Sequence, residues 1–508
     1  KGMVLEDQQQ VLSSIRKSGD STALSIYNQW RFNKTFLGKE YLLPKAQRII
    51  YLDSLEEATT QQEQELSRRS GKFKNQQSSQ TITPNDIARN LHQGEASVEF
   101  IKFQLYKNKW TDSILYGALV LLPGDSIPKF EILFEENQLK KLIVASGSSA
   151  ATYTAIQKLY GGMNSSNNTP EVNYSLYRLI WKPLEKYLSG VSNIYYVPAG
   201  LLHRISFQAL RYSTSHYLLE KYQLNQLLST RSIAYSQNTN STYGSVNIWG
   251  NINYNITNKT AASYQNKHSN NIDRKISPFD LYALATRSII KNGAAKLPSK
   301  MREIDSIQIM LKQMQVPVIT TVGSGATEKA FKALNGKSQQ VLHLATHGFF
   351  LPISQSKTTN DLHFANAFTM QQDPMFRSGL MLAGGNYAWK GGIVPPDKED
   401  GILTAYELAQ MDLSNTQLMV LSACETALGD LQGTEGVIGL QRAIKLAGVK
   451  QMIVSLWKVP DKETVELMTM FYRNWLTGQT TRQAMRNAQL NMKEKYSPFY
   501  WAAFVLVE

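Results

Sequence analysis

The chain has 508 residues, 42% of them apolar, and its 54 basic and 40 acidic side chains give a formal net charge of +14. This length predicts two or three domains with ordinary cores. The basic residues are scattered apart from RRSGKFK at 68–74, and no zinc-finger spacing or RNA-binding aromatic motif occurs. We therefore expect a solvated basic surface that suits acidic protein partners, and no direct nucleic-acid partner.

Cysteine usage narrows the class further. The chain contains one cysteine, Cys424, which excludes an intramolecular disulfide and a cysteine-rich metal site and fits a reducing cytoplasm. The apolar runs are too short to span a bilayer, and no signal peptide precedes them. The sequence contains neither a GxxxxGK[ST] nor an HExxH motif, so we expect no cofactor. Because the chain begins with Lys1 rather than Met, we expect it to be a fragment of a longer protein.

Residues 1–80 are predicted to be helical. A first segment ends at Gly19, a candidate helix C-cap, and Asp20 or Ser21 is expected to cap the next helix. A third helix, rich in Glu and Gln, is expected over 45–69. Antiparallel helices of this kind suit the end of a tetratricopeptide-type array, although no clean repeat is present. A plain helical packing layer fits the same residues equally well.

Residues 85–235 follow a linker candidate at 76–86 and alternate strand-like with helical segments. The strand-like runs are VEFIKFQLY (98–106), YGALVLL (116–122), KFEILF (129–134) and NIYYVP (193–198), and a helical stretch covers 174–190. This alternation predicts an α/β fold with a mostly parallel sheet. His203 lies just after the turn in this region and is an alternative catalytic base, but no Cys follows it at the end of a neighbouring strand.

Residues 236–280 are predicted to form a long loop, because they are rich in Asn, Ser, Thr and Tyr and show no apolar periodicity. Order is expected to resume over 281–508. A helix is predicted at 301–314, a strand at 316–323, and a further helix with Thr327 as its N-cap.

Two stretches of the C-terminal region carry reactive residues. VLHLATHGFF (341–350) and LMVLSACETALGD (418–430) each open with an apolar run of strand length, which stops at His347 in the first and at Cys424 in the second. Side chains at the carboxyl ends of parallel strands face a common crevice. Taken separately, a lone Cys is usually a small buried hydrophobe and a lone His a structural residue. As a pair at equivalent positions they predict a cysteine nucleophile with a histidine base.

The residues next to this pair fit the same chemistry. The backbone N–H groups of Gly348 and Cys424 are candidates for an oxyanion hole. A loop-rich span over 351–400 separates the two strands and is expected to bind substrate or gate the site. After Cys424 we expect a helix closed by Gly448, the strand QMIVSLW, two helices and a last buried strand, WAAFVLV.

With these motifs the sequence resembles the CHAT domains, relatives of caspases and separase. The matching strings include YYVPAGLLHRISFQAL, ATHGFF, RSGLMLAGGN, DGILTAYEL, VLSACETALGD, GTEGVIGLQRAIKLAGV, IVSLWKVPD, AMRNAQLNM and FYWAAFVL, and the resemblance runs from about residue 85 to residue 508. It implies caspase-like, doubly wound and mostly parallel sheets, with a degenerate silent half over 85–235 and a catalytic half over 281–508. It also implies His347 as base and Cys424 as nucleophile.

The resemblance further implies a function. Such proteins are cysteine endopeptidases that cut a protein substrate, often carry tetratricopeptide repeats in front, are often activated by a protein partner, and act in bacterial defence and programmed death. The alternative is a catalytically silent scaffold for protein–protein interaction. The intact set of His347, Gly348 and Cys424 favours the enzyme, because a decayed copy is expected to lose it.

The segment SLWKVPD also resembles a separase stretch whose acidic residue receives a basic substrate side chain. Asp461 matches an acidic position of that stretch, whereas Lys458 stands where separase has a second acid. This match predicts that Asp461 binds substrate. The alternative is that Asp461 caps a helix beginning at Lys462.

Overall fold

The computed structural model describes residues 5, 9, 13–15, 20–42, 52–74, 82–143, 159–161, 169–235, 244–255, 294–295, 297–351, 374–390, 394, 398–423, 429–432 and 436–508. Within them an eleven-stranded sheet forms the centre of the molecule. In order across the sheet its strands are β3 (Lys129–Glu135), β2 (Trp110–Leu121), β1 (Glu95–Tyr106), β4 (Asn193–Val197), β5 (Gln223–Gln226), β16 (Phe504–Val507), β15 (Gln451–Ser455), β12 (Leu418–Leu421), β8 (Val341–Leu344), β6 (Val246–Ile252) and β7 (Val318–Gly323).

The predicted α/β class with a mostly parallel sheet is confirmed. Neighbouring strands run parallel from β1 through β4 and β5 to β16, and again from β15 through β12, β8 and β6 to β7. Antiparallel pairs occur where β3, β2 and β1 form a meander and where β15 meets β16. The connections between these strands are short, and a short connection allows only antiparallel neighbours because a parallel pair needs a long crossover. One of the turns places Asn108 at a φ of 58°.

Two smaller sheets lie beside the large one. The first is three-stranded and antiparallel, with β11 (Ile402–Thr404), β10 (Ser378–Met381) and β9 (His347–Phe350) in that order. The second pairs β13 (Gly429–Gln432) with β14 (Gly436–Gly439). The β9 strand begins at His347, the candidate base predicted from the sequence.

Helices cover the sheets and form a separate layer at the N-terminal side. The α-helices are α2 (Ser21–Leu42), α3 (Leu52–Lys74), α4 (Pro84–Arg89), α5 (Glu136–Ile143), α7 (Thr169–Ile180), α8 (Leu218–Lys221), α11 (Pro298–Gln313), α12 (Glu328–Lys332), α14 (Gly385–Trp389), α15 (Ala405–Ala409), α16 (Leu440–Leu446), α17 (Asp461–Leu476), α18 (Thr481–Lys493) and α19 (Pro498–Trp501). The 3₁₀ helices are η2 (Lys182–Tyr187), η3 (Gly200–Arg204), η4 (Phe207–Ala209) and η5 (Thr230–Tyr235).

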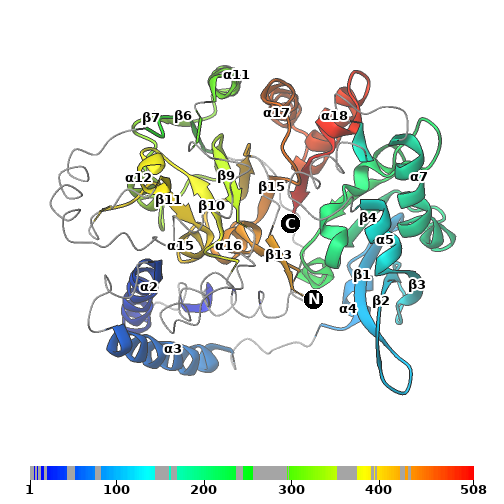
Figure 1. Cartoon of the computed structure of the whole chain (residues 1–508), viewed down its shortest axis with the longest axis horizontal. Coiled ribbons are helices and arrows are strands. Elements are labelled where there is room, and N and C mark those ends of the chain that lie inside the picture. Colours follow the sequence, from blue (N-terminus) through cyan, green and yellow to red (C-terminus); the bar gives the residue numbers. More distant parts are fainter. Residues whose placement is uncertain are drawn as a thin grey trace.

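Asp20 and Thr327 cap the N-termini of helices, as predicted. The Asp20 carboxylate accepts the backbone N–H groups of Thr22 and Ala23 at the start of α2, and the Thr327 hydroxyl accepts that of Ala330 in α12. The helix expected over 45–69 is observed as α3, which begins at Leu52 and ends at Lys74. In Figure 1, α2 and α3 lie together beside the C-terminal half, whose α15 contacts α2.

Three expectations about strands are corrected by the structure. The loop predicted over 236–280 is wrong for residues 246–252, which form β6 in the sheet between β8 and β7. Residues 236–243 and 256–280 lie outside the described part. The polar residues on either side make this stretch look like a loop in the sequence. The strand itself, VNIWGNI, is almost wholly buried, as a strand covered on both faces must be. The helix expected to close at Gly448 begins only at Leu440, because residues 436–439 form a strand that pairs with β13.

The third correction concerns the histidine strand. The strand expected to stop at His347 ends earlier, at Leu344, as β8, and a separate strand, β9, begins at His347. Ala345 still donates its N–H to the Trp249 carbonyl of β6, at 2.7 Å. The hydroxyl of Thr346 then donates to the Met381 carbonyl of β10, so the chain turns out of the large sheet here and joins the small one. His347 thus lies beyond the end of β8, as the first residue of β9.

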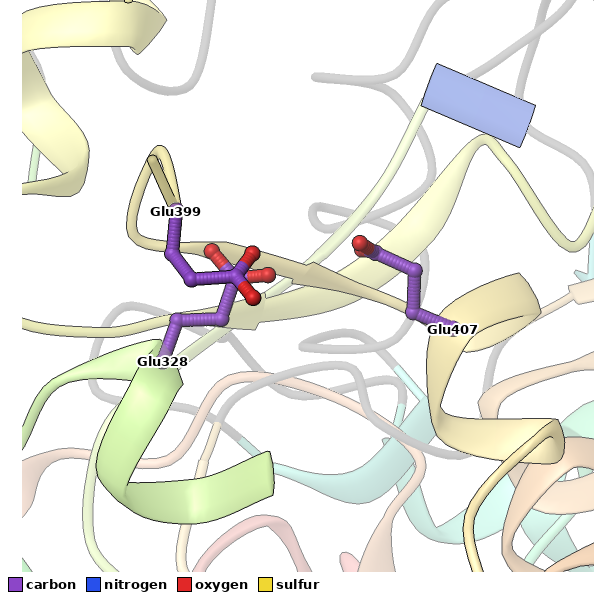
Figure 2. Close-up of side chains that lie close together, drawn as sticks. All are labelled: Glu328, Glu399 and Glu407. Atoms are coloured by element: carbon purple, nitrogen blue, oxygen red, sulfur yellow. The ribbon is translucent and has the colours of Figure 1, made fainter. Parts of the chain in front are cut away.

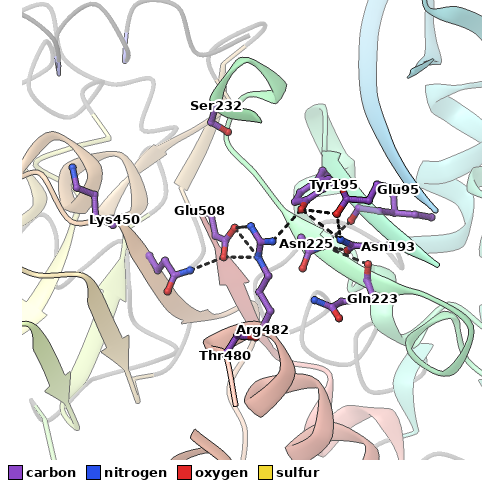
Figure 3. Close-up of polar contacts among 12 residues, drawn as sticks. Glu95, Asn193, Tyr195, Gln223, Asn225, Ser232, Lys450, Thr480, Arg482 and Glu508 are labelled. Atoms are coloured by element: carbon purple, nitrogen blue, oxygen red, sulfur yellow. Dashed lines mark hydrogen bonds and ion pairs between the residues drawn. The ribbon is translucent and has the colours of Figure 1, made fainter. Parts of the chain in front are cut away.

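The two halves of the sheet meet at a short seam between β5 and β16. Their strand register comprises one residue pair, Gln226 with Val507, and a polar network beside it joins α18 to the first half (Figure 3). In that network the Arg482 guanidinium pairs with the Glu508 carboxylate and donates to the Tyr195 hydroxyl at 3.2 Å. The Tyr195 hydroxyl donates to Glu95 at 3.1 Å. One apolar core runs under both halves, and the domain boundaries proposed from the sequence stay predictions.

Candidate active site

A cavity of about 240 Å³ opens at the carboxyl ends of three adjacent strands of the second half. Its wall includes His347 beyond β8, Ala423 beyond β12 and the segment from Lys458 to Asp461 beyond β15. Lys300 of α11 and Phe504 of β16 also line it. This is the edge of a parallel sheet where ligands are expected to bind.

Strand register brings the histidine segment and the cysteine segment to this cavity. β8 and β12 are parallel, with Leu344 opposite Leu421, and Ser422 donates its N–H to the Leu344 carbonyl at 2.9 Å. The next residue, Ala423, lines the cavity together with His347. Cys424 follows it directly in sequence but lies outside the described residues, so the pairing of its thiol with His347 stays a prediction.

The orientation of His347 is fixed by a backbone carbonyl. Its Nε2 lies 2.8 Å from the Ala295 oxygen, which only accepts, so Nε2 carries the proton and Nδ1 is the basic nitrogen of the neutral ring. The Tyr254 ring lies 5.3 Å from the imidazole, centroid to centroid. This carbonyl fixes the tautomer and orientation of the ring, which is what the third member of a triad does for a catalytic base.

The electrostatic surroundings keep this imidazole uncharged. Burial is the main cause that lowers the pKa of His347, and the charges of Lys458 and Lys300 act in the same direction. The hydrogen bond to Ala295 and the charge of Asp461 oppose this shift without cancelling it. At neutral pH the ring is therefore in the form that can take up a proton.

A hydrogen-bond chain supports the backbone just before His347. The Thr346 hydroxyl uses its proton on the Met381 carbonyl, so it accepts from the Tyr254 hydroxyl, 3.0 Å away. Burial raises the pKa of Tyr254 to about 12, which keeps this phenol a donor at every physiological pH. The chain ties β6, β8 and β10 together at the point where His347 enters the cavity.

Below the cavity lies a buried polar network that the sequence reasoning did not identify. The Lys300 ammonium donates to Glu303 at 2.9 Å and to the Ser422 hydroxyl at 2.6 Å. The other oxygen of Glu303 lies 3.1 Å from Nε2 of His343, whose Nδ1 lies 3.1 Å from the Tyr472 hydroxyl. A carboxylate accepts, so Nε2 of His343 is protonated and Tyr472 donates to Nδ1.

The carboxylate in this network is ionised despite complete burial. Burial alone raises the pKa of Glu303, but the charge of Lys300 and the hydrogen bonds from His343 and Ser422 outweigh it and lower the pKa to about 2. The side chains of Lys300 and Glu303 are 4% and 0% exposed, so bulk solvent does not screen the pair.

The remaining predicted residues fall in different places. Gly348 lies in β9 opposite Leu380, whereas the cavity wall runs through Thr346 and His347. Asp461 lines the cavity as the first residue of α17, and Pro460 holds the N-cap position, so the capping alternative is wrong. His203 lies in η3 of the first half, 8% exposed and away from the cavity wall.

Comparison with known proteins assigns the family. The family model of the CHAT domain matches residues 171–508. The chain belongs to the CHAT domain family. Tetratricopeptide repeat protein 28 of Mus musculus is 32% identical over 116 residues, and the protein of that name from Homo sapiens is 30% identical over 115 residues. Each match covers 22% of this chain and 5% of the relative, so the chain spans only a small part of these relatives' length.

Two solved structures resemble this CHAT protein at low sequence identity. The Arg-specific cysteine proteinase gingipain R matches with a TM-score of 0.35 and 12% identity, over 71% of this chain and 68% of its own. The Saccharomyces cerevisiae separase–securin complex matches with a TM-score of 0.41 and 8% identity, over 84% of this chain and 30% of its own. Within the described part of the CHAT protein, every helix is too short or too polar to cross a bilayer.

A cluster of three glutamates in the CHAT domain has the appearance of a metal site. Side chains of Glu328, Glu399 and Glu407 converge from α12, a loop and α15 (Figure 2). However, the Lys332 ammonium bonds to all three carboxylates, at 2.9 Å to Glu399 and 2.8 Å to Glu407. Because an ammonium already occupies the centre, the cluster is a salt-bridge network that fastens residues 398–401 to the core, and we assign it no metal.

Two signals in the sequence point to the missed network of the CHAT domain. His343 interrupts the apolar run VLHL, and a polar side chain inside a buried strand needs a buried partner. Lys300 and Glu303 are spaced three apart on the helix stripe that also carries Ile304 and Ile307. The partners come from four separate segments, so sequence spacing alone does not bring them together.

Proposed function

We propose that this CHAT protein is a cysteine endopeptidase that uses Cys424 as nucleophile and His347 as base. The observation that carries the proposal is the in-register pairing of β8 with β12, which places His347 and Ala423 on the wall of one cavity. Cys424 is the next residue and the only thiol of the chain. Membership of the CHAT family and the neutral state of His347 support the same chemistry.

The proposed reaction follows from these groups. An ordinary thiol is mostly protonated at neutral pH, so Nδ1 of His347 takes the proton while the Cys424 sulfur attacks the peptide carbonyl. Backbone N–H groups of Gly348 and Cys424 hold the oxyanion. The imidazolium then gives its proton to the leaving amine, and water hydrolyses the thioester by the same route. The Ala295 carbonyl keeps the ring in the tautomer that these steps require.

Asp461 is proposed to select the residue before the cut bond. Its place on the cavity wall, next to Lys458 and Pro460, supports a contact with a substrate side chain. A carboxylate there favours a basic side chain, above all an Arg that can bind in bidentate fashion. Lys458 on the same wall works against this preference, so the selectivity should be modest.

The setting of the reaction is also proposed. A protein substrate, an activating protein partner, a cytoplasmic location and a role in bacterial defence or programmed death follow from the resemblance to CHAT peptidases. Most of the span over 351–400 that was expected to gate the site lies outside the described residues.

The proposal is tested by labelling and digestion. A peptide with a thiol-directed electrophile at its C-terminus should modify the purified protein once, at Cys424, and a peptide library should be cut at a defined sequence. Cys424→Ala should lose both reactions while remaining folded. Labelling and cleavage that persist in a folded Cys424→Ala protein exclude the mechanism. A thiol that reacts with small alkylating agents but never with peptide probes, with or without partners, indicates the scaffold instead.

A further inference from the structure

The starting point is the position of the Lys300 ammonium. It lies on the cavity wall that also carries His347 and Ala423, yet its side chain is only 4% exposed. Two of its three protons are used, one on Glu303 and one on Ser422. A fixed, poorly solvated cation therefore lies under the segment that leads into Cys424.

The charges of this network have a direction. Glu303 is fully buried behind Lys300, does not line the cavity, and has its second oxygen turned toward His343. The positive end of the ion pair thus faces the cavity and the negative end faces the core. Lys458 and Asp461 are the other charged side chains on the described cavity wall, and Lys458 is exposed to solvent, which screens its field.

Ser422 connects the cation to the end of β12. Its backbone N–H bonds to the Leu344 carbonyl and its hydroxyl accepts from Lys300 at 2.6 Å. The hydroxyl also donates to Glu303, one of the interactions that lower the pKa of that carboxyl. Ser422 is thus held by three bonds two residues before Cys424. Apolar packing would hold a strand end at least as cheaply as a buried ion pair, so a packing role alone does not account for the pair.

We propose that Lys300 is a positioning residue of the thiol: its ammonium, backed by Glu303, fixes the end of β12 through Ser422, two residues before Cys424, and favours the thiolate of that cysteine. This inference rests on the proposed function only in taking Cys424 as the nucleophile. A nearby cation favours the charged form of a thiol, so it lowers the pH at which the thiolate forms.

The single cysteine gives a direct measurement. The rate of alkylation by iodoacetamide, followed by mass spectrometry across a pH series on the whole purified chain, reports the thiolate fraction of Cys424. Lys300→Met/Glu303→Gln removes both charges, while the introduced amide oxygen can still accept from His343. We expect the alkylation midpoint of this double variant to move to higher pH, with a rate at neutral pH on the order of tenfold lower.

Two controls separate charge from packing. Lys300→Arg keeps the cation and should keep the midpoint near that of the wild type. Lys312→Met removes an exposed charge from the same helix and should leave the midpoint unchanged. An unchanged midpoint in the folded double variant overturns the proposal, and so does an equal shift in Lys312→Met. If the double variant does not fold, a Lys300→Arg midpoint displaced as far as that of a folded Lys300→Met also overturns it.

The outcomes for this inference and for the proposed function are distinct, because alkylation needs no peptide cleavage. A wild type that cuts no peptide but whose midpoint depends on Lys300 retains the inference and loses the peptidase. If the wild type cuts peptides but its alkylation midpoint does not depend on Lys300, the peptidase function is retained and the inference is lost.

Discussion

The two halves of the sheet differ in the segment that follows a central parallel strand, β4 in the first half and β8 in the second. In the first half, β4 leads into η3, where His203 is packed into the core. In the second half, β8 leads to a sharp exit from the sheet, and His347 meets a cavity of about 240 Å³. Their ionic networks differ as well: Arg482 and Glu508 join the halves with side chains 26% and 11% exposed, whereas Lys300 and Glu303 are buried under the cavity.

This difference teaches that a histidine in the segment after a sheet strand is not enough to make a candidate site. The second half adds a neighbouring strand end in register, an open volume and a fixed charge beneath it. In the first half the corresponding histidine is packed in the core, and the ion pair at its border joins structural elements. The same kind of substitution in the two halves should therefore have very different effects.

The largest contrast is expected between the two histidines. His347→Ala, like Cys424→Ala, should reduce kcat/KM by at least about a thousandfold, because the members of a dyad act as a unit. His203→Gln should stay within about tenfold of the wild type, since it lies off the cavity wall. Peptide cleavage is compared with circular dichroism spectra to confirm folding. A loss in folded His203→Gln as large as that in His347→Ala would contradict the assignment of the active half.

The next contrast is in stability. Lys300→Met leaves the Glu303 carboxylate buried without its countercharge and should lower the free energy of unfolding by about 3–5 kcal/mol. Arg482→Met leaves a partly solvated Glu508 and should cost about 1–3 kcal/mol. Urea unfolding at neutral pH measures both. Equal losses would mean that the two ion pairs are buried to a similar degree in solution.

The same network makes stability depend on acid. The pKa of Glu303 is lowered from 4.5 to about 2 in the folded protein, so its contribution is fully present above pH 4.5 and is lost as the pH falls toward 2. That contribution is about 3 kcal/mol. Lys300→Met/Glu303→Gln should flatten this part of the stability profile. A wild-type profile with no slope in this window would contradict the ionised buried carboxylate.

A smaller effect is expected on specificity. Asp461→Asn should lower kcat/KM on an Arg peptide by about tenfold and leave a matched Leu peptide nearly unchanged. Lys458→Met should act in the opposite sense on the Arg peptide, because it removes a competing cation from the same wall. Equal losses on both peptides, or none on Arg, would remove Asp461 from the specificity pocket.

The smallest effect is on the pH profile. The rate should fall on the acid side as His347 is protonated, below the ordinary imidazole range because burial lowers its pKa. Lys458 adds to that lowering and Asp461 opposes it. Lys458→Met should therefore move the acid limb up by a few tenths of a pH unit, and Asp461→Asn should move it down. Shifts of the same sign in both variants would show that the limb does not report His347.

The sequence indicated the fold class and the pairing of two strands well, because apolar runs such as LMVL are unambiguous. It failed where context decides the outcome. Residues 246–252 are a strand because β8 and β7 flank them, although the surrounding composition is typical of a loop. The exit at Thr346 depends on the Met381 carbonyl, which lies far along the chain.

The same limit applies to the candidate site. His347 stands out because a reactive residue ends an apolar run, and Asp461 stands out through a motif. Lys300 and Glu303 look like an ordinary helix-surface pair, since helix spacing does not reveal that α17 covers them. The tautomer of His347 is equally invisible, because it depends on the Ala295 carbonyl 52 residues earlier.

The place of β16 has a consequence for how the protein is made. Residues 504–507 lie in the middle of the large sheet, between β5 and β15, so the first half keeps an open strand edge until they leave the ribosome. Synthesis proceeds at about 5–20 residues per second, so that edge waits for more than 250 residues to follow β5. Exposed edges recruit other strands, and a nascent chain in this condition is open to mispairing or to binding by chaperones. Ordering of the cavity, whose wall includes Phe504, then coincides with closure of the sheet.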